Sequence, residues 1–305
     1  MSTAPAARVP EPAPMSDDRT PLTVARLAAE HLKARGVPDP RLDAELLLAA
    51  ALGVRRLDLY LQHDRPLTDD ELEPYREMIR RRARREPLQY ITGSVAFREI
   101  ELRVDRRALI PRPETEILVG VVLDWSRARA SSATAPLRAL DIGTGTGVIA
   151  LSLLAEGGFG TVVATDASAD ALALAAENAA ALGLTERLEL RHGSLYEPLR
   201  PDERFDAVVS NPPYISTATR AVLAPEVIDW EPAAALFAGA AGLDLVEPIV
   251  RQAAERLARR GLLALELAET QALEVAELAR VSGFDEVRII EDLTGRARIV
   301  AAERV

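Results

Sequence analysis

The chain has 305 residues, of which 48% are hydrophobic, and it carries a formal net charge of -10 with a pI of about 5.1. The length fits one large domain or two smaller ones, and the acidic balance argues against a general nucleic-acid binder, which needs a basic surface. The lack of cysteine excludes disulfides and thiolate metal sites, and the histidines at positions 31, 63 and 192 lie too far apart to suggest a metal site.

The first segment, residues 1–20, is rich in proline and alanine and has no apolar core of a secretory signal. We expect it to be a disordered tail. No stretch of the chain approaches the ~18 consecutive apolar residues of a membrane span. We therefore expect no membrane association and a cytoplasmic location.

Residues 21–90 show helical periodicity and predict a small all-α bundle. One predicted helix places positions 24, 27, 28, 31 and 32 on a common face, and Gly36 marks its end. Another ends at Gly53. A third begins with Thr68 at the N-cap and Glu71 three residues later, the pattern of a capping box.

Arginines gather near the end of this helical region, at positions 80, 81, 82, 84 and 85. Cations near a helix C-terminus complement its dipole and favour a solvated face, which is one interpretation. The other interpretation is a basic patch that meets an acidic partner.

The periodicity changes after residue 90. Residues 91–110 alternate apolar and polar side chains and predict a β-hairpin that links two domains. From 111 to 305 the pattern predicts a catalytic α/β domain with a mostly parallel sheet covered by helices on both faces. We expect strands over 137–141, 161–165, 188–191, 205–210, 262–267, 286–291 and 297–302, with helices that include 147–156, 168–182 and 244–259.

A glycine-rich loop follows the first of these strands. Gly143, Gly145 and Gly147 let the backbone turn sharply and approach a ligand at the start of a helix. Their G-x-G-x-G spacing differs from the dinucleotide fingerprint. Asp166 ends the next strand and can accept the hydroxyls of a ribose, or it can cap the helix that follows. Asp141 can meet the positive end of a cofactor, so the pattern indicates a nucleoside-containing ligand.

The fourth strand runs into Asn211-Pro212-Pro213-Tyr214 at the sheet edge where open α/β folds bind ligands. The asparagine offers an amide oxygen, and the prolines, which lack an N–H, offer only carbonyl acceptors on a fixed backbone. The tyrosine offers a flat face for stacking. This arrangement suits a planar –NH2 group that is held by acceptors and turned toward a methyl donor.

The glycine loop and Asp166 together resemble the S-adenosylmethionine-dependent methyltransferase fold, which is Rossmann-like. Residues 41–53 and 85–119, with "DIGTGTGVIAL" and "VVSNPPYI", resemble the HemK-type release factor glutamine methyltransferases. The resemblance extends from about residue 20 to the C-terminus. It implies methylation, with S-adenosylmethionine as cofactor, of the side-chain nitrogen (N5) of the Gly-Gly-Gln glutamine in class-1 peptide-chain release factors. It also implies that the helical domain helps hold that protein substrate.

The resemblance also assigns roles to single residues. The cofactor would contact Asp141, Asp166, Leu195, Asn211 and the loop of Gly143, Thr144, Gly145, Thr146 and Gly147. The glutamine amide would be held by Asn211, Pro212, Pro213 and Tyr214, and the pocket wall would include Arg112, Pro113 and Glu114. The chain departs from the family at Ser194, where an aspartate is usual, and at Ala268, where a glycine is common.

Other functions remain open at this point. The same chemistry could act on a ribosomal-protein glutamine or on a small-molecule nitrogen. A DNA adenine methyltransferase is disfavoured by the acidic pI and by the lack of a target-recognition domain. A catalytically silent binding protein is disfavoured by the intact Asn-Pro-Pro-Tyr sequence.

Overall fold

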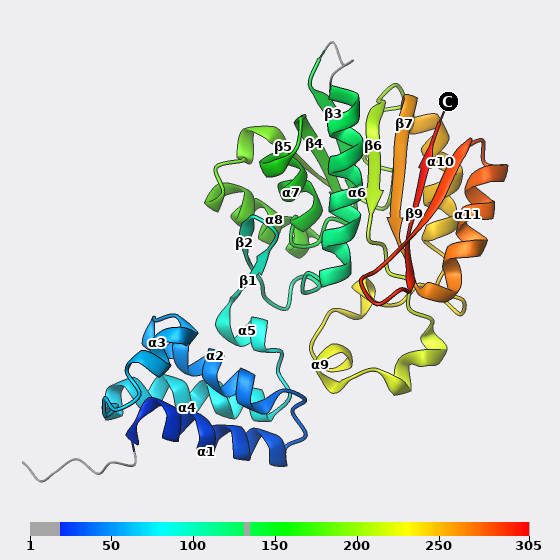
Figure 1. The fold of residues 1–305 in the computed structure, drawn as a ribbon. Helices are drawn as coiled ribbons and strands as arrows, with labels where there is room; N and C mark the ends of the chain where they lie inside the picture. The colour runs from blue at the N-terminus through cyan, green and yellow to red at the C-terminus, as the bar shows by residue number, and fades with distance from the viewer. Residues whose placement is uncertain (1–18, 131–134, 305) are drawn as a thin grey trace, which may run out of the picture. The chain divides into compact units, whose positions relative to one another are not determined.

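The computed structural model describes residues 19–130 and 135–304 and divides them into two compact units (Figure 1). The division falls between Thr92 and Gly93. Most of the predicted tail, residues 1–18, lies outside the described residues. Within the described ranges, no helix combines the length and the apolar character needed to cross a membrane, and no group of three or more acidic and histidine side chains is arranged to hold a metal ion.

The first unit consists of helices packed around one apolar core. They are α1 (Pro21–Ala34), α2 (Pro40–Leu52), α3 (Arg56–Leu61), α4 (Asp69–Ala83) and α5 (Leu88–Thr92). The predicted capping box is present at the start of α4: Thr68 accepts the Glu71 N–H at 3.3 Å and Glu71 accepts the Thr68 N–H at 2.9 Å. Gly53 ends α2 in the left-handed conformation that favours glycine. The predicted helical region is therefore confirmed.

The buried face of α1 differs from the predicted one. Ala25 and Leu32 are buried, with Ala28 and Ala29 partly buried against the same core. Leu27, by contrast, is 51% exposed, and His31 is exposed as well. Alanine and leucine are both apolar, so periodicity alone does not choose between two overlapping stripes. The alanine stripe lies inside because small side chains let α1 approach its neighbouring helices closely.

The arginines near the end of α4 form ion pairs within the first unit. Arg80 pairs with Glu77 at 2.8 Å and Arg81 with Glu86 at 2.6 Å. Arg82 is buried, and its Nε donates to Asp43 on α2 at 2.7 Å. The structure thus favours internal pairing for these three side chains over a basic patch for an acidic partner.

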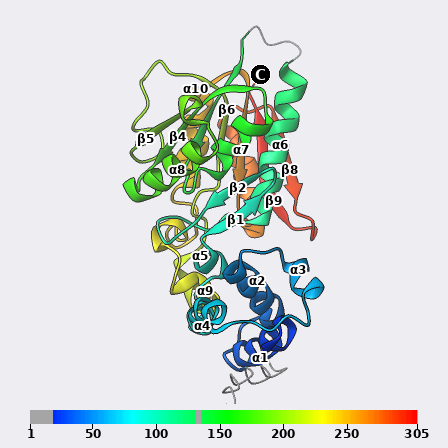
Figure 2. The same ribbon diagram turned by 90° about the vertical axis from the view of Figure 1, so that its left-hand side faces the viewer.

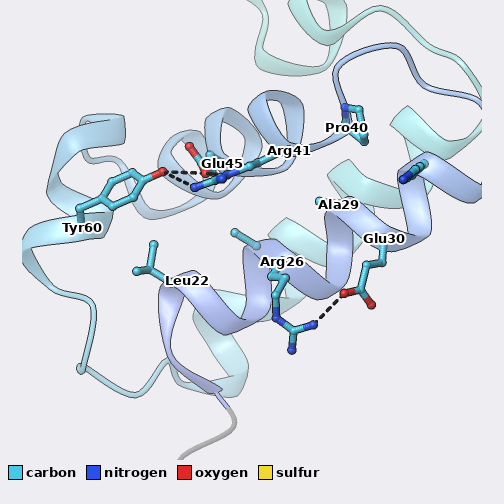
Figure 3. A pocket seen from close by; sticks show the side chains of 10 residues that line it. Leu22, Arg26, Ala29, Glu30, Pro40, Arg41, Glu45 and Tyr60 are labelled. Carbon is cyan, nitrogen blue, oxygen red and sulfur yellow. Dashed lines mark hydrogen bonds and ion pairs between the residues drawn. The ribbon is translucent and has the colours of Figure 1, made fainter.

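A cavity of about 430 Å³ opens among α1, α2 and α3 (Figure 3). Its lining comes from Leu22, Ala25, Arg26, Ala29, Glu30, Lys33, Pro40, Arg41, Glu45 and Tyr60. Glu45 is buried and accepts hydrogen bonds from Tyr60, Arg41 and Arg56 at 2.7, 2.9 and 2.7 Å. Burial alone would raise the pKa of Glu45, but these hydrogen bonds outweigh it and hold the pKa below its usual value. The carboxylate therefore ties α2 to α3.

The second unit begins with the predicted hairpin, formed by β1 (Ser94–Phe97) and β2 (Ile100–Arg103), and continues into α6 (Pro113–Ala130). The buried amide of Asn178 joins this hairpin to the glycine loop. Asn178 accepts the Arg103 N–H at 2.8 Å, and its Nδ2 donates to the carbonyls of Arg103 and Thr146 at 3.1 and 2.9 Å. The hairpin is thereby fixed against the α/β core of the second unit.

A seven-stranded sheet forms the centre of the second unit, in the order β5-β4-β3-β6-β7-β9-β8. Its strands are β3 (Leu137–Ile142), β4 (Phe159–Asp166), β5 (Leu188–His192), β6 (Phe205–Ser210), β7 (Leu257–Glu266), β8 (Glu286–Glu291) and β9 (Ala297–Glu303). All neighbours pair in parallel except β9, which is antiparallel to both β7 and β8. The predicted mostly parallel, Rossmann-like sheet is confirmed.

Helices cover both faces of the sheet (Figures 1 and 2). They are α7 (Val148–Glu156), α8 (Ala169–Ala181), α10 (Val246–Arg256) and α11 (Ala272–Val281), with the short α9 (Pro225–Ile228) in the connection after β6. Side chains of α6, α7 and α8 share one apolar core, and those of α10 and α11 share the other. The strand order reverses at β3, which lies between β4 and β6. Open α/β sheets bind ligands at the carboxyl ends of the strands that flank such a reversal.

The helix predicted over 244–259 ends three residues early, at Arg256. Leu257 already pairs with Phe205 as the first residue of β7, and the register shifts before Ala207. Strand pairing with β6, in the interior of the sheet, outweighs the local helical pattern of "RLARR", because it satisfies backbone groups of a core element.

The buried pair of Arg82 and Asp43 gives a test of the first unit. Asp43→Ala leaves a buried guanidinium without its carboxylate, which costs about 3 kcal/mol in comparable cases. We expect the α2 and α4 amides to lose protection in hydrogen exchange of the full chain. Glu30→Ala breaks the exposed Arg26–Glu30 pair and serves as the control, with an expected change below about 0.5 kcal/mol. Equal protection in both variants would contradict the role of the buried pair.

Candidate active site

The glycine loop joins β3 to α7 at the reversal of the strand order. Gly143, Gly145 and Gly147 have φ angles of 73°, 56° and 84°, which side chains with a Cβ rarely adopt. A Cβ on Gly147 would also lie 3.0 Å from Leu151 Cδ1 and 3.2 Å from Ala175 Cβ. Glycine at this position therefore serves both the turn and the close packing of α7 and α8.

Asp166 ends β4 and faces the glycine loop. Its Oδ2 accepts the Gly145 N–H at 2.9 Å and its Oδ1 accepts the Ser168 N–H at 2.8 Å. The side chain that caps α8 is Ser168, which accepts the Ala171 N–H. Each carboxylate oxygen of Asp166 keeps a further lone pair, so the group retains acceptor capacity toward a ligand.

Asp141 lies behind the loop, fully buried on β3. Its Oδ2 accepts from the Thr144 hydroxyl at 2.6 Å and from the Ala150 N–H at 3.3 Å. Its Oδ1 has no hydrogen-bond partner among the described residues. Burial, and to a smaller extent the charge of Asp166, raises the pKa of Asp141 to about 7. The orphaned oxygen marks an acceptor that a ligand or a water can satisfy.

A cavity of about 340 Å³ opens at the carboxyl edge of β3, β4 and β6. Its walls come from residues 107–112 before α6, from Thr115 on α6, from the glycine loop and the first turns of α7 and α8, from the turns after β4 and β5, and from the segment after β6. The remaining lining residues are Pro232, Ala234, Ala235, Leu245 and Ile249. Of the predicted site residues, the cavity is lined by Arg112, Gly143, Thr144, Gly145, Asp166, Leu195, Asn211, Pro212 and Pro213. Asp141, Thr146, Gly147, Pro113, Glu114 and Tyr214 are not among its lining residues.

The Asn-Pro-Pro-Tyr segment leaves β6 after Ser210, and a network of buried side chains, of which Thr115 also lines the cavity, holds it in place. Asn211 Nδ2 donates to Thr115 Oγ1 at 3.1 Å, and that hydroxyl donates to Glu266 Oε2 at 2.7 Å. The Tyr214 hydroxyl donates to Glu266 Oε1 at 3.3 Å. Gln271 Nε2 donates to the Tyr214 carbonyl at 3.1 Å. The segment is therefore fixed at both its first and last residues.

Two contacts join the loop before α6 to the loop that contains residues 229–232. Arg112 pairs with the buried Glu231 at 2.6 Å, and the Arg106 guanidinium lies 4.1 Å from the ring centre of Trp230. Burial raises the pKa of Glu231, although Arg112 opposes this effect. The predicted pocket residue Arg112 thus acts as a clamp between two walls of the cavity.

Sequence reasoning missed Thr115, Glu231 and Glu266. Thr115 directly follows the predicted pocket residues 112–114, and on α6 its side chain turns inward toward Asn211. Glu266 is the one acidic residue within the apolar run of β7, a detectable signal for a carboxylate at the sheet edge. Glu231 has no such signal, because only the fold brings it to Arg112.

Comparisons with known families cover most of the chain. Residues 23–93 match the family described as "PrmC N-terminal domain", and residues 130–234 match "Methyltransferase small domain". The chain is 43% identical over 270 residues to the release factor glutamine methyltransferase of Geobacter sulfurreducens, which covers 88% of this chain and 92% of that protein. The relative of the same name from Deinococcus radiodurans is 42% identical, covering 91% and 96%. That from Rhodopirellula baltica is 37% identical, covering 93% and 97%.

Solved structures share the fold at lower identity. The hMettl16 catalytic domain in complex with hairpin 1 of the MAT2A 3′UTR matches with a TM-score of 0.54 and 18% identity, covering 76% of this chain and 80% of that one. The T. thermophilus 16S rRNA N2 G1207 methyltransferase in complex with AdoMet and guanosine matches with a TM-score of 0.51 and 19% identity, covering 70% and 50%. These likenesses confirm the Rossmann-like methyltransferase fold, and the curated relatives, matched over nearly their whole length, show that the chain belongs to the family of release factor glutamine methyltransferases.

Proposed function

We propose that this protein transfers a methyl group from S-adenosylmethionine to the side-chain amide nitrogen (N5) of the glutamine in the Gly-Gly-Gln motif of class-1 peptide-chain release factors. The observation that carries the proposal is that Asn211, Pro212 and Pro213 open into the same cavity as the glycine loop and Asp166. A nucleoside site and an amide-binding site therefore share one chamber. Because release factors act on ribosomes, we place the protein in the cytoplasm.

The cavity fits the cofactor. The backbone of Gly143 and Gly145 borders it without a side chain in between, which suits close approach of a ligand. Asp166 supplies an acceptor for the ribose hydroxyls, and Leu195 supplies an apolar surface for the adenine. When bound, S-adenosylmethionine provides an electrophilic methyl group on a sulfonium. The orphaned Asp141 Oδ1 adds negative potential behind the loop.

The chain contributes to the reaction by positioning. An amide nitrogen is a weak nucleophile because its lone pair is delocalised. Glu266, the buried carboxylate that is linked to Asn211 through Thr115, does not line the cavity. Asn211 Oδ1 and the proline carbonyls are acceptors for the two amide hydrogens, and rigid proline backbone holds those acceptors in place. Fixed acceptors that need no rearrangement lower the barrier through orientation and electrostatics.

We also propose that the helical unit, residues 21–90, helps dock the release factor. Its match to the N-terminal domain of the family supports this role. The cavity lies in the second unit, so a small peptide has less need of the helical unit than a folded protein has.

The assay that tests the proposed function uses labelled S-adenosylmethionine and a purified class-1 release factor. We expect label on this factor and none on the factor with its Gly-Gly-Gln glutamine changed to alanine. Label on both factors would show that a residue other than the Gly-Gly-Gln glutamine is methylated. Label on neither, with the cofactor bound, would favour a ribosomal-protein or small-molecule substrate.

Asn211→Ala removes an acceptor for the substrate amide. We expect turnover to fall at least ~10²-fold, as for loss of a preorganised polar contact. The affinity for S-adenosylmethionine, measured by calorimetry, should change little. Near-normal turnover would contradict the assigned role of Asn211.

Asp166→Ala removes the acceptor for the ribose hydroxyls. Hydrogen bonds to a charged group are worth about 1.5–3 kcal/mol, so cofactor affinity should fall by about 10- to 100-fold in calorimetry. Asp170→Ala is a matched control, since Asp170 is an exposed acid on α8 that does not line the cavity. If both variants bind the cofactor equally well, Asp166 does not hold the ribose.

Deletion of residues 1–92 tests the docking role at the boundary between the units. We expect KM to rise more for a folded release factor than for a short Gly-Gly-Gln peptide, because only the folded factor reaches the helical unit. Thermal melting and cofactor binding check that the truncated protein folds. An equal change in KM for both substrates would refute docking by residues 21–90.

A further inference from the structure

Glu266 is a fully buried carboxylate directly behind the proposed substrate-binding segment. It ends β7, and its two oxygens accept the hydroxyls of Thr115 on α6 and Tyr214 after β6. Glu114 on α6 and Arg298 on β9 are the charged groups that act on it. A charge buried this deeply is costly unless it is paired and hydrogen-bonded, and here two hydroxyls donate to the carboxylate.

The direction of the hydrogen bonds follows from counting hydrogens. An ionised carboxylate can only accept hydrogen bonds. The Thr115 hydroxyl must therefore donate its single hydrogen to Glu266. The oxygen of Thr115 can then only accept from Asn211. Asn211 must therefore turn its NH2 group toward Thr115, as the 3.1 Å bond from Nδ2 requires. Its carbonyl oxygen Oδ1 is left for the substrate side.

The opposite orientation of Asn211 has nearly the same shape but the wrong chemistry. A flipped amide would aim its NH2 at the NH2 of a glutamine substrate, so two donors would meet. It would also set its own oxygen against the Thr115 oxygen. The network behind the segment therefore selects between two orientations that packing alone does not distinguish.

We propose that Glu266 is a positioning residue that fixes the hydrogen-bond polarity of the site: through Thr115 it holds the Asn211 amide with Oδ1 toward the substrate, and through the Tyr214 hydroxyl it holds the far end of the Asn-Pro-Pro-Tyr segment. This inference rests on the proposed function, because it assigns Asn211 Oδ1 to the amide of the substrate glutamine.

The protonation state of Glu266 depends on pH near neutrality. Burial is the main cause that raises the pKa of Glu266 to about 7; Glu114 adds to the rise, while Thr115, Tyr214 and Arg298 oppose it. Below that pH the protonated carboxyl can donate to Thr115, whose hydroxyl is then released to turn toward Asn211. Because the site needs the ionised form, kcat should fall as pH is lowered through about 7. From pH 8 to pH 6 the ionised fraction of a group with this pKa drops about tenfold.

The test compares kcat, KM and the pH profile of methyl transfer to the release factor in four variants. Thr115→Val keeps the shape but has no hydroxyl, and should lower kcat on the order of 10²-fold, as misplaced binding groups do. Thr115→Ser restores the hydroxyl and should return kcat to within a few-fold of the unaltered protein.

Glu266→Gln can point either its oxygen or its NH2 at Thr115, so it should lower kcat about tenfold and abolish the fall below pH 7. Glu269→Gln removes an exposed charge three residues away and should keep both kcat and the pH profile.

Calorimetry with S-adenosylmethionine separates positioning from general damage, since the cofactor affinity of all four variants should stay near that of the unaltered protein. If Thr115→Val does not fold, the pH profile of Glu266→Gln decides the question. Equal kcat and an unchanged pH profile in Glu266→Gln would overturn the inference. Absence of label with the unaltered protein would instead overturn the proposed function, so the two failures are distinguishable.

Discussion

The parallel register of β3 with its neighbours is the constraint on which the site depends. Ile142 pairs with Thr165 of β4 and with Ser210 of β6, and Ser210 pairs with Leu265 of β7. The residues that follow these four along β3, β4, β6 and β7 therefore lie side by side at the carboxyl ends of the strands. They are Gly143, Asp166, Asn211 and Glu266. Four positions far apart in the sequence meet at one edge because parallel strands end together.

Two carboxylates at this edge are buried, and neither forms an ion pair with a cation among the described residues. Asp141 supports the glycine loop through Thr144, and Glu266 supports the Asn-Pro-Pro-Tyr segment through Thr115. Burial raises the pKa of both carboxyl groups to about 7, which means that the folded protein favours their neutral form over their ionised form. Each therefore costs stability when it is ionised, and each holds a segment that borders the cavity. This is the pattern expected where function, rather than packing, keeps a polar group inside.

The walls of the cavity are joined by contacts of a different kind. Arg112 with Glu231, and Arg106 with Trp230, connect the loop before α6 to the connection after β6. The Asn178 amide connects the hairpin to the glycine loop. These side-chain contacts hold the loops that border the cavity in a fixed geometry.

The sequence by itself determined the class of the fold, the glycine loop and the position of the Asn-Pro-Pro-Tyr segment at the end of β6. Strand–helix alternation, glycines at positive φ and an Asn-Pro-Pro-Tyr after an apolar strand are local patterns, and local patterns can be read from the chain. The prediction for Leu27 and His31 was wrong because two apolar stripes overlap on α1 and packing chooses one. Similarly, the last turn predicted for the helix before β7 became strand, since sheet pairing outweighs local periodicity.

Only the tertiary structure decided which side chains contact the Asn-Pro-Pro-Tyr segment. Thr115 and Asn211 are separated by 96 positions, and Thr115 and Glu266 by 151. No local pattern relates such residues. Their contact depends on strand register and on the packing of α6 against the sheet, and hydrogen-bond polarity is set by which donors and acceptors that packing brings together.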